Sequence, residues 1–415
     1  MADGVHDRSG HQIFEWLLRL KSKSETRQRK PLVLSEPVPR QLAVLSKPLT
    51  ASIVSTAAEL HDLTAFVSSL APEPGMLAPR FFLASILPRS CRPCVVVVSQ
   101  GHRIAGLLFG KERLVAGIPT GIVLGDNTLG AMVVASPDES ESVMHCAVET
   151  LLKHKAALRF RVAADHLALL QAESSKANAE IHCCRGGHHA HLDLPRTYDE
   201  FLAKFRSSTR RNFCRYRRRS EVAGNEFSQD QSFTDFCAAA RRLFPKAAHA
   251  KGASTLRRCL AMIEAMPSRL LFGLRRKSGD WISLAGGWRL GDRAFLCLQL
   301  NDRDCARESV SLVLRSYLIE HLINQGIREL VFWSGTSAPL SFYTTPREEF
   351  TVYIDSRSHF WRLVRLSCVT LAKLAPATFG RWLNWQAPDV DENPGQFSES
   401  PSVNEKLPVG PPPGF

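Results

Sequence analysis

The stretch that decides the fold is RLLFGLRRKSGDWISLAGGWRLGDRAFLCLQL, residues 269–300. Apolar runs over 269–275 and 281–288 flank the turn residues Ser278-Gly279-Asp280, which is the pattern of a β-hairpin. A third strand is predicted over 293–300. The segment therefore begins a sheet whose first strands run antiparallel.

The next segment predicts a helix and a closing strand. The helix runs from about Ser309 to Asn324 and is ended by Gly326, because a glycine just past a helix readily takes the left-handed conformation. The strand covers Ile327–Trp333. A hairpin followed by a helix and a crossover strand indicates an α+β domain.

The first half of the chain shows the same order of elements. Strands are predicted at Pro93–Val98 and Arg103–Gly110, followed by a glycine-punctuated stretch, a helix over about Glu139–His154 and a strand at Leu158–Val162. The helix and its following strand recur after 170 residues. This repetition predicts two tandem modules with mixed central sheets. Chance similarity is the alternative, because hairpins and strand–helix units are common.

A basic run lies between the two halves. Thr197-Tyr-Asp-Glu200 has the pattern of a capping box, which predicts a helix start. Apolar residues then recur at helical spacing and form a stripe on one face. The basic residues are therefore expected on a helix that packs on the protein through this stripe and presents a cationic surface to an anionic partner. A solvated cationic face is the alternative. The stripe is Phe205, Thr209, Phe213 and Tyr216, and the run is Lys204, Arg206, Arg210, Arg211, Arg215, Arg217, Arg218 and Arg219.

Composition narrows the class of protein. The 415 residues are 44% hydrophobic and carry a net charge of +13, which is typical of a globular protein with phosphate-bearing or other anionic partners. The N-terminus lacks the apolar core of a signal peptide, and eleven cysteines without an export signal fit reduced thiols. A cytoplasmic protein, peripheral at the inner membrane, is therefore expected.

The domain organisation follows from these patterns. The basic amphipathic segment has two interpretations, namely lying on an anionic membrane surface or packing on the body as a terminal helix. We expect a mostly disordered segment at 1–50, an N-terminal module at 51–195, a C-terminal module at 196–355, the basic amphipathic segment at 356–390 and a disordered tail at 391–415.

Several of these residues match the pattern of a known group. The chain resembles the GNAT-fold acyltransferases of the FemABX-like group, and more closely the tandem-GNAT acetyltransferases of bacterial cellulose or exopolysaccharide biosynthesis. The resemblance covers about residues 80–355. It rests on a "Y-x-x-[FY]-L…R-x-x-x-R-R" helix, here Tyr198, Phe201, Leu202, Arg206, Arg210 and Arg211, and on a later motif similar to Gly326–Gly335 followed by Phe342-Tyr343.

The resemblance implies a site in the second module. In a GNAT fold two neighbouring strands splay apart, the acyl donor inserts between them, and its pyrophosphate lies at the N-terminus of the following helix. Here the splay is expected between 293–300 and 327–333. The chain departs from the coenzyme-A-binding pattern at 301–309, which contains no glycine. The resemblance therefore leaves the donor open between acyl-CoA, such as acetyl-CoA, and another carrier such as aminoacyl-tRNA.

Candidate site residues follow from this placement. Acyl transfer needs a group that removes a proton from the nucleophile and a donor that protonates the leaving group. The predicted catalytic residues are Asp302 and Tyr343, with a solvated loop residue as the alternative for the carboxylate. The predicted cofactor-binding residues are Gln299, Arg303, Arg307, Ser309 and Trp333, and the predicted substrate-phosphate ligands are Arg210, Arg211, Arg215 and Arg218.

A metal site is not expected. Cys91-x-x-Cys94, His182-Cys183-Cys184 and His188-His189-Ala-His191 together suggest zinc ligands, but the second and third groups lack a regular spacing.

These observations predict an acyltransferase of bacterial polysaccharide or cell-envelope biosynthesis with an anionic small-molecule or carrier-linked substrate. Two alternatives remain, a non-catalytic scaffold subunit of a polysaccharide-synthesis complex and an aminoacyl transferase that uses tRNA.

Overall fold

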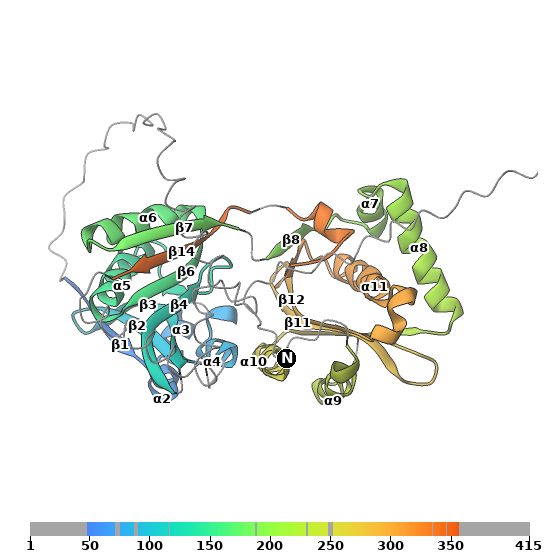
Figure 1. Ribbon diagram of the computed structural model, residues 1–415, viewed down its shortest axis with the longest axis horizontal. Helices are drawn as coiled ribbons and strands as arrows, with labels where there is room; N and C mark the ends of the chain where they lie inside the picture. Colours follow the sequence, from blue (N-terminus) through green and yellow to red (C-terminus); the bar gives the residue numbers. More distant parts are fainter. Residues whose placement is uncertain are drawn as a thin grey trace, which may run out of the picture. The chain divides into compact units, whose positions relative to one another are not determined.

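The computed structural model describes residues 48–70, 75–86, 90–115, 117–186, 189–229, 231–247, 252–333, 335–345 and 347–356. The predictions for the disordered tail and for nearly all of the basic amphipathic segment lie outside these residues. The described chain forms two mixed sheets with helices packed on them (Figure 1). The α+β class predicted from the sequence is confirmed.

The first sheet has the order β1-β2-β3-β4-β6-β14-β7, with β5 paired to β3. Strand β1 begins at Leu49, at the end of the segment expected to be disordered. The strands are β1 (Leu49–Val54), β2 (Cys91–Gln100), β3 (Arg103–Val115), β4 (Ile118–Asp126), β5 (Val133–Ala135), β6 (Ala157–Ala163), β7 (Glu180–Arg185) and β14 (Glu349–Asp355), and the helices of this half are α2 (Ala57–Asp62), α3 (Thr64–Leu70), η1 (Gly75–Leu77), α4 (Pro79–Ser85), α5 (Ser140–His154) and α6 (Ala164–Lys176).

Strand β4 lies in the glycine-punctuated stretch, for which the sequence predicted no strand. Its glycines serve packing as well as turning. A Cβ on Gly125 would lie 2.5 Å from the Met132 sulfur and 2.9 Å from the Phe160 ring. The strand therefore needs a glycine where its neighbours approach closely, and this need is not visible in the local sequence.

The second sheet has the order β8-β13-β12-β11-β10-β9. One face packs against α7, α8 and α11, and the opposite face against α9 and α10. The elements are α7 (Tyr198–Ala203), α8 (Ser207–Val222), α9 (Phe233–Leu243), η2 (Phe244–Lys246), α10 (Ala253–Ala265), η3 (Arg303–Glu308), α11 (Val310–Asn324) and η4 (Leu340–Tyr343), with strands β8 (Ala190–Asp193), β9 (Glu226–Ser228), β10 (Arg269–Arg275), β11 (Trp281–Leu290), β12 (Arg293–Asn301) and β13 (Glu329–Phe332).

The two sheets repeat one topology. Strands β2, β3 and β4 pair antiparallel in order, and β6 joins β4 in parallel after helix α5. Strands β10, β11 and β12 do the same, and β13 joins β12 in parallel after α11. The predicted repetition of hairpin, helix and crossover strand is thus present, with β4 completing the first copy.

The sheets also exchange their next strands. Strand β14, drawn in red in Figure 1, lies between β6 and β7 of the first sheet, although it follows the whole second sheet in the chain. Strand β8 pairs with β13 of the second sheet, although it precedes residue 196. Strand pairing therefore crosses the predicted module boundary between 195 and 196.

The basic run forms two helices where the sequence predicted one. The Thr197 hydroxyl accepts a hydrogen bond from the Glu200 amide at 3.2 Å, as a capping residue should, while the Glu200 carboxylate accepts from the Arg196 amide. Helix α7 ends at Ala203, and Arg206 is extended. The break turns Phe205 into the core, where it is 4% exposed and packs against the ring of Phe213.

Candidate functional site

Strands β12 and β13 stop pairing with each other about halfway along β12. They pair in parallel only from Arg293–Glu329 to Leu296–Phe332, and the Trp333 amide donates the last hydrogen bond to the Leu296 carbonyl at 2.9 Å. A turn closed by the Gly335 amide and the Phe332 carbonyl then leads β13 away. In the described chain β12 continues to Asn301 with a strand partner only on its β11 side.

A β-bulge lies where this pairing ends. Leu296 and Leu298 oppose the consecutive residues Gly287 and Gly286, so Cys297 is one extra residue in β12. A bulge bends its strand and increases the local twist. A Cβ at Gly287 would overlap the carbonyl oxygen of Phe295, so the two strands approach closely only because Gly287 has no side chain.

The first sheet has no comparable gap in its described residues. Strand β4 pairs with β6 from Ile122 to Asp126, and the Asn127 amide extends the pairing to the Arg161 carbonyl at 2.7 Å. The opening is therefore a property of the second copy of the topology.

Helix α11 begins beside the gap. Its N-cap residue, Ser309, has φ 52° and ψ 39°, and no side chain caps the helix. A non-glycine residue in the left-handed region costs roughly 1–2 kcal/mol. The first turn carries no acidic residue. No acidic residue of the first turn therefore offsets the positive end of the helix dipole.

Helix α8 brings cations to this helix start. The Ser309 side chain hydrogen-bonds Tyr216, and this bond lowers the pKa of the Tyr216 hydroxyl, helped by Arg215. Arg215 donates to the Tyr216 hydroxyl at 3.2 Å, and its guanidinium lies 4.9 Å from the ring centroid. Arg215 therefore lies near the start of α11.

The arginines of α8 divide into two groups. Arg217 is used inside the protein: it donates to Glu320 at 2.6 Å and its guanidinium lies 4.1 Å from the Tyr317 ring centroid, which docks α8 on α11. The four predicted phosphate ligands are exposed instead. Arg206, Arg210 and Arg211 also begin the helix, and its first turn has no acid to offset their repulsion from the dipole.

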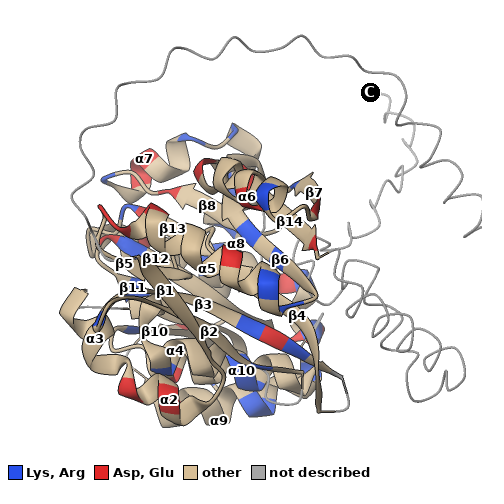
Figure 2. Ribbon diagram, turned by 90° about the vertical axis from the view of Figure 1, so that its left-hand side faces the viewer, with Lys and Arg blue, Asp and Glu red and all other residues tan. Residues whose placement is uncertain are grey.

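The chain around the first sheet is different. Figure 2 shows basic and acidic residues interspersed along its strands and helices. Between Ser207 and Ser220, by contrast, α8 has no acidic residue at all.

Inside the gap the structure gathers four polar side chains. Gln299 of β12 donates to the Ser311 hydroxyl at 2.9 Å, and its carbonyl oxygen accepts from Arg315 at 2.9 Å. Arg315 also donates to the Ser337 hydroxyl at 3.3 Å. Burial lowers the pKa of Arg315 to about 10, so it stays cationic at neutral pH.

Sequence reasoning identified Gln299 but missed Arg315. The feature of the sequence that could have identified Arg315 is its position as a single cation among apolar residues of α11. These residues, which are all buried, are Val310, Val313, Leu314, Leu318 and Ile319.

The other predicted cofactor ligands lie in different places. Trp333 packs on the opposite face of the sheet from Gln299, with its ring 5.5 Å from the Trp288 ring. Arg303 donates to the carbonyls of Pro245 and Lys246 in η2, the short helix that follows α9. Arg307 is exposed in η3, just before α11.

The two predicted catalytic residues are both engaged in local structure. The Asp302 carboxylate caps η3 by accepting from the Asp304 amide at 3.0 Å. The Tyr343 ring packs against Phe205 at 4.3 Å, and its hydroxyl accepts from the Arg206 amide at 3.4 Å. Tyr343 therefore lies beside the break between α7 and α8.

The cysteine and histidine groups are dispersed. Among the residues that the structure describes, no three His, Cys, Asp or Glu side chains form a group that would hold a metal ion. The two cysteines of Cys91-x-x-Cys94 lie on β2, whereas Cys183-Cys184 lies on β7. His191 donates to Glu329 at 2.7 Å, and His188 lies outside the described residues.

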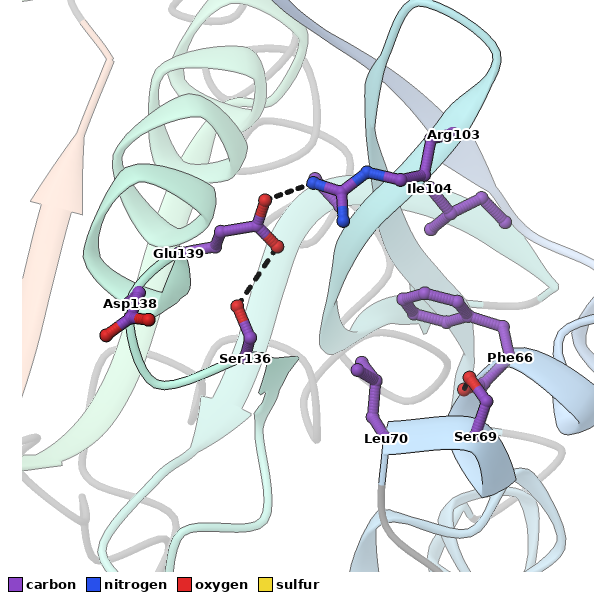
Figure 3. A pocket seen from close by; sticks show the side chains of 9 residues that line it. Phe66, Ser69, Leu70, Arg103, Ile104, Ser136, Asp138 and Glu139 are labelled. Carbon is purple, nitrogen blue, oxygen red and sulfur yellow. Dashed lines mark hydrogen bonds and ion pairs between the residues drawn. The ribbon is translucent and has the colours of Figure 1, made fainter.

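A pocket of about 620 Å³ lies in the first half and contains none of the predicted site residues. Figure 3 shows Arg103 and Ser136 both bonded to Glu139 at its edge. Phe66 and Leu70 line the other side. The Arg103 and Glu139 charges thus satisfy each other, and Asp138 is a further acidic residue of the lining.

The family model of the acetyltransferase (GNAT) domain matches residues 203–338, which include α8, the gap between β12 and β13, and the start of α11. Residues 203–338 are therefore similar to a GNAT acetyltransferase domain, which agrees with the predicted acyltransferase activity. Tyr343 lies outside the matched segment.

Three solved structures illustrate the range of similar folds. A tandem GNAT protein from the clavulanic acid biosynthesis pathway is 13% identical, with 75% of this chain and 99% of that chain covered and a TM-score of 0.43. L-PGS from Bacillus licheniformis is 14% identical (74% and 94% covered, TM-score 0.46), and FemX is 11% identical (70% and 95% covered, TM-score 0.47). No curated protein matches the sequence.

None of the helices in the described part of the chain has the length and apolar character needed to cross a membrane.

Proposed function

We propose that this protein transfers an acyl group from acyl-CoA to an anionic precursor of bacterial polysaccharide or of the cell envelope. The observation that carries the proposal is the early end of the β12–β13 pairing at Leu296 and Phe332. Beyond it, the free edge of β12 offers backbone amides and carbonyls to the amide groups of a pantetheine arm, as a missing strand would.

The start of α11 supports acyl-CoA as the donor. A glycine-rich loop lets backbone amides turn toward a pyrophosphate, and residues 301–309 contain no glycine. Ser309 has the left-handed conformation that a glycine would supply. With Arg215 and Arg307 nearby in the chain fold, this uncapped helix start is the proposed pyrophosphate site.

The chemistry at the gap is direct acyl transfer. The acceptor nucleophile attacks the thioester carbonyl, loses a proton and expels the coenzyme A thiolate, which takes up a proton. Asp302 is the proposed base and Tyr343 the proposed acid. The Tyr343 hydroxyl accepts from the Arg206 amide, which leaves its own proton available for donation.

The exposed arginines of α8 support an anionic acceptor. Arg210, Arg211 and Arg218 lie on the solvent side of a helix whose first turn has no acidic residue, while Arg215 is assigned to the donor. Phosphate groups of a nucleotide-linked or lipid-linked sugar are ligands of suitable charge. The same charge favours the second candidate, aminoacyl transfer from tRNA.

Calorimetric titration of the full chain with acetyl-CoA tests the donor. We expect saturable binding, which Arg215→Gln weakens about tenfold through the loss of a charge-assisted contact. Arg275→Gln is the matched control, because Arg275 of β10 is paired with Glu226 of β9. Absence of binding by any coenzyme A ester would exclude this donor, and tRNA binding that falls steeply with salt would favour the second candidate.

A scaffold role is separated from catalysis by turnover. Release of free coenzyme A from acetyl-CoA in the presence of phosphorylated amino sugars is the expected result. Donor binding without thiol release under any acceptor, for the parent protein and for Tyr343→Phe alike, would favour the scaffold.

A further inference from the structure

Arg315 is a buried cation without a counter-charge. Arg315 is 7% exposed, and it donates hydrogen bonds to the neutral side chains of Gln299 and Ser337. No carboxylate among the described residues forms an ion pair with it. Arg217 and Arg293, which are more exposed, pair with Glu320 and Glu329.

Such a cation is costly for the folded protein. Removing a charge from water costs several kcal/mol unless an opposite charge compensates it. An apolar side chain of similar length would fill the same space without this cost. The described residues therefore give this charge neutral hydrogen-bond partners and no carboxylate to neutralise it.

The place of the guanidinium is as informative as its charge. Gln299 lies on β12 beyond the bulge, and Ser337 lies beyond the turn that ends β13. Arg315 contacts both, and its guanidinium lies 5.4 Å from the Phe332 ring centroid. It therefore spans the gap that the proposed function assigns to the acyl group.

We propose that Arg315 binds a carboxylate of the substrate and so makes the enzyme selective for a carboxylate-bearing acyl group or a carboxylate-bearing acceptor. This inference rests on the proposed function. A guanidinium has five N–H donors, and the structure shows two of them in use. Both N–H groups of Nη2 are among the remaining donors, and guanidinium N–H groups lie in a planar fork that matches a carboxylate.

Charge balance favours a carboxylate over a phosphate. One carboxylate neutralises one guanidinium, whereas a phosphate dianion would leave an excess negative charge in a buried place. The phosphates of the donor have their own proposed site at Ser309 and Arg215. Arg315 thus addresses the group at the reacting end of the substrate.

Binding of matched probes distinguishes the two sources of the carboxylate. The full chain is titrated with coenzyme A, acetyl-CoA and succinyl-CoA, and separately with L-alanine and L-alaninamide. If the acyl group carries the carboxylate, succinyl-CoA binds about tenfold more tightly than acetyl-CoA. If the acceptor carries it, the coenzyme A esters bind alike and L-alanine binds more tightly than its amide.

Two variants and one control assign the effect to Arg315. Arg315→Gln is expected to abolish the preference for the carboxylate probe and to leave coenzyme A binding unchanged. Arg275→Gln, which removes an exposed cation on β10, is expected to keep the preference. Arg315→Met is expected to melt at or above the temperature of the parent protein, and carboxylate probes no longer raise its melting temperature.

Two outcomes overturn the inference. One is a parent protein that does not discriminate either pair of probes. The other is Arg315→Met that melts lower while keeping the parent's preference, because Arg315 would then only join β12 to the segment after β13. If L-alanine is selected through Arg315 but no coenzyme A ester binds, the donor assignment fails and the carboxylate site stands.

Discussion

At the scale of single residues, Gly287 determines how closely β11 and β12 approach at the bulge. Gly287→Ala would push a Cβ against the Phe295 carbonyl, which is backbone and cannot rotate away. We expect a loss of about 1–3 kcal/mol in the free energy of unfolding, measured by urea denaturation, together with weaker acetyl-CoA binding.

Gly186→Ala is the matched control, because no heavy atom lies within 4 Å of a Cβ at that position. Its effect is expected to stay within about 0.5 kcal/mol. Equal stability of Gly287→Ala and the parent protein would mean that the bulge is free to rearrange.

Residues such as Gly287 and Arg315 also show where sequence reasoning stops. Gly326 was predicted as the end of α11 because a helix stop is a local feature, and its φ of 76° confirms it. The need for Gly287 arises from a strand partner eight residues away, and the isolation of Arg315 from any carboxylate arises from the whole packing around it. Neither is written in a local pattern.

At the scale of elements, Arg217 of α8 contacts α11, whereas the other arginines of α8 are exposed to solvent. Arg217→Ala removes the ion pair with Glu320 and the stacking on Tyr317, so we expect a loss of about 1–2 kcal/mol in the free energy of unfolding. Arg218→Ala is expected to change it by less than about 0.5 kcal/mol and to weaken binding of phosphorylated ligands.

The double variant Arg217→Ala with Glu320→Ala measures the coupling between the two side chains. A coupling energy near zero would show that α8 is held by its apolar stripe alone. Equal loss of stability in Arg217→Ala and Arg218→Ala would contradict the division of the helix into a docking and a displaying face.

The elements also separate what short-range patterns predict from what they cannot. The apolar stripe placed Phe205 and Phe213 in the core correctly, since helical spacing is read within one segment. The break before Ser207 was missed, because Phe205 turns inward to meet Phe213 and Tyr343, which comes from much later in the chain. The gap between β12 and β13 was predicted only through the family resemblance.

At the scale of the whole molecule, a buried ionic cluster joins the exchanged strands. Glu329 of β13 bonds His191 of β8 at 2.7 Å and Arg293 of β12 at 2.5 Å, and Arg347 before β14 also pairs with it. His191 lies 3.6 Å from Glu349 of β14. The cluster therefore contacts strands of both sheets.

This cluster predicts a loss of stability in acid. Burial would raise the pKa of Glu329, but the bond from His191 and the charges of Arg293 and Arg347 outweigh it and lower the pKa from 4.5 to about 2. The stabilisation is complete above pH 4.5 and is lost as the pH falls toward 2. It amounts to about 3 kcal/mol.

Denaturant unfolding of the parent protein from pH 6 down to 2 measures this dependence. Glu329→Gln is expected to flatten it, whereas Glu348→Gln, an exposed acid paired with Arg185, leaves it unchanged. An unaltered slope in Glu329→Gln would assign the acid sensitivity to other carboxylates.

Strand exchange makes a final prediction about how the chain divides. A fragment of 196–356, cut one residue beyond the predicted module of 196–355, lacks β8 and exposes the edge of β13, and it carries β14 without its partners β6 and β7. A fragment of 190–345 keeps every strand of the second sheet together with α7, α8 and α11.

We expect 190–345 to unfold cooperatively in urea and 196–356 to aggregate or to lack a cooperative transition, because an unpaired apolar edge strand promotes association. The 190–345 fragment lacks the packing of Phe81 against the Trp288 ring. We therefore expect it to be less stable than the full chain. Cooperative unfolding of 196–356 at equal or higher urea concentration would show that β8 is dispensable and that the exchange is not what joins the two halves.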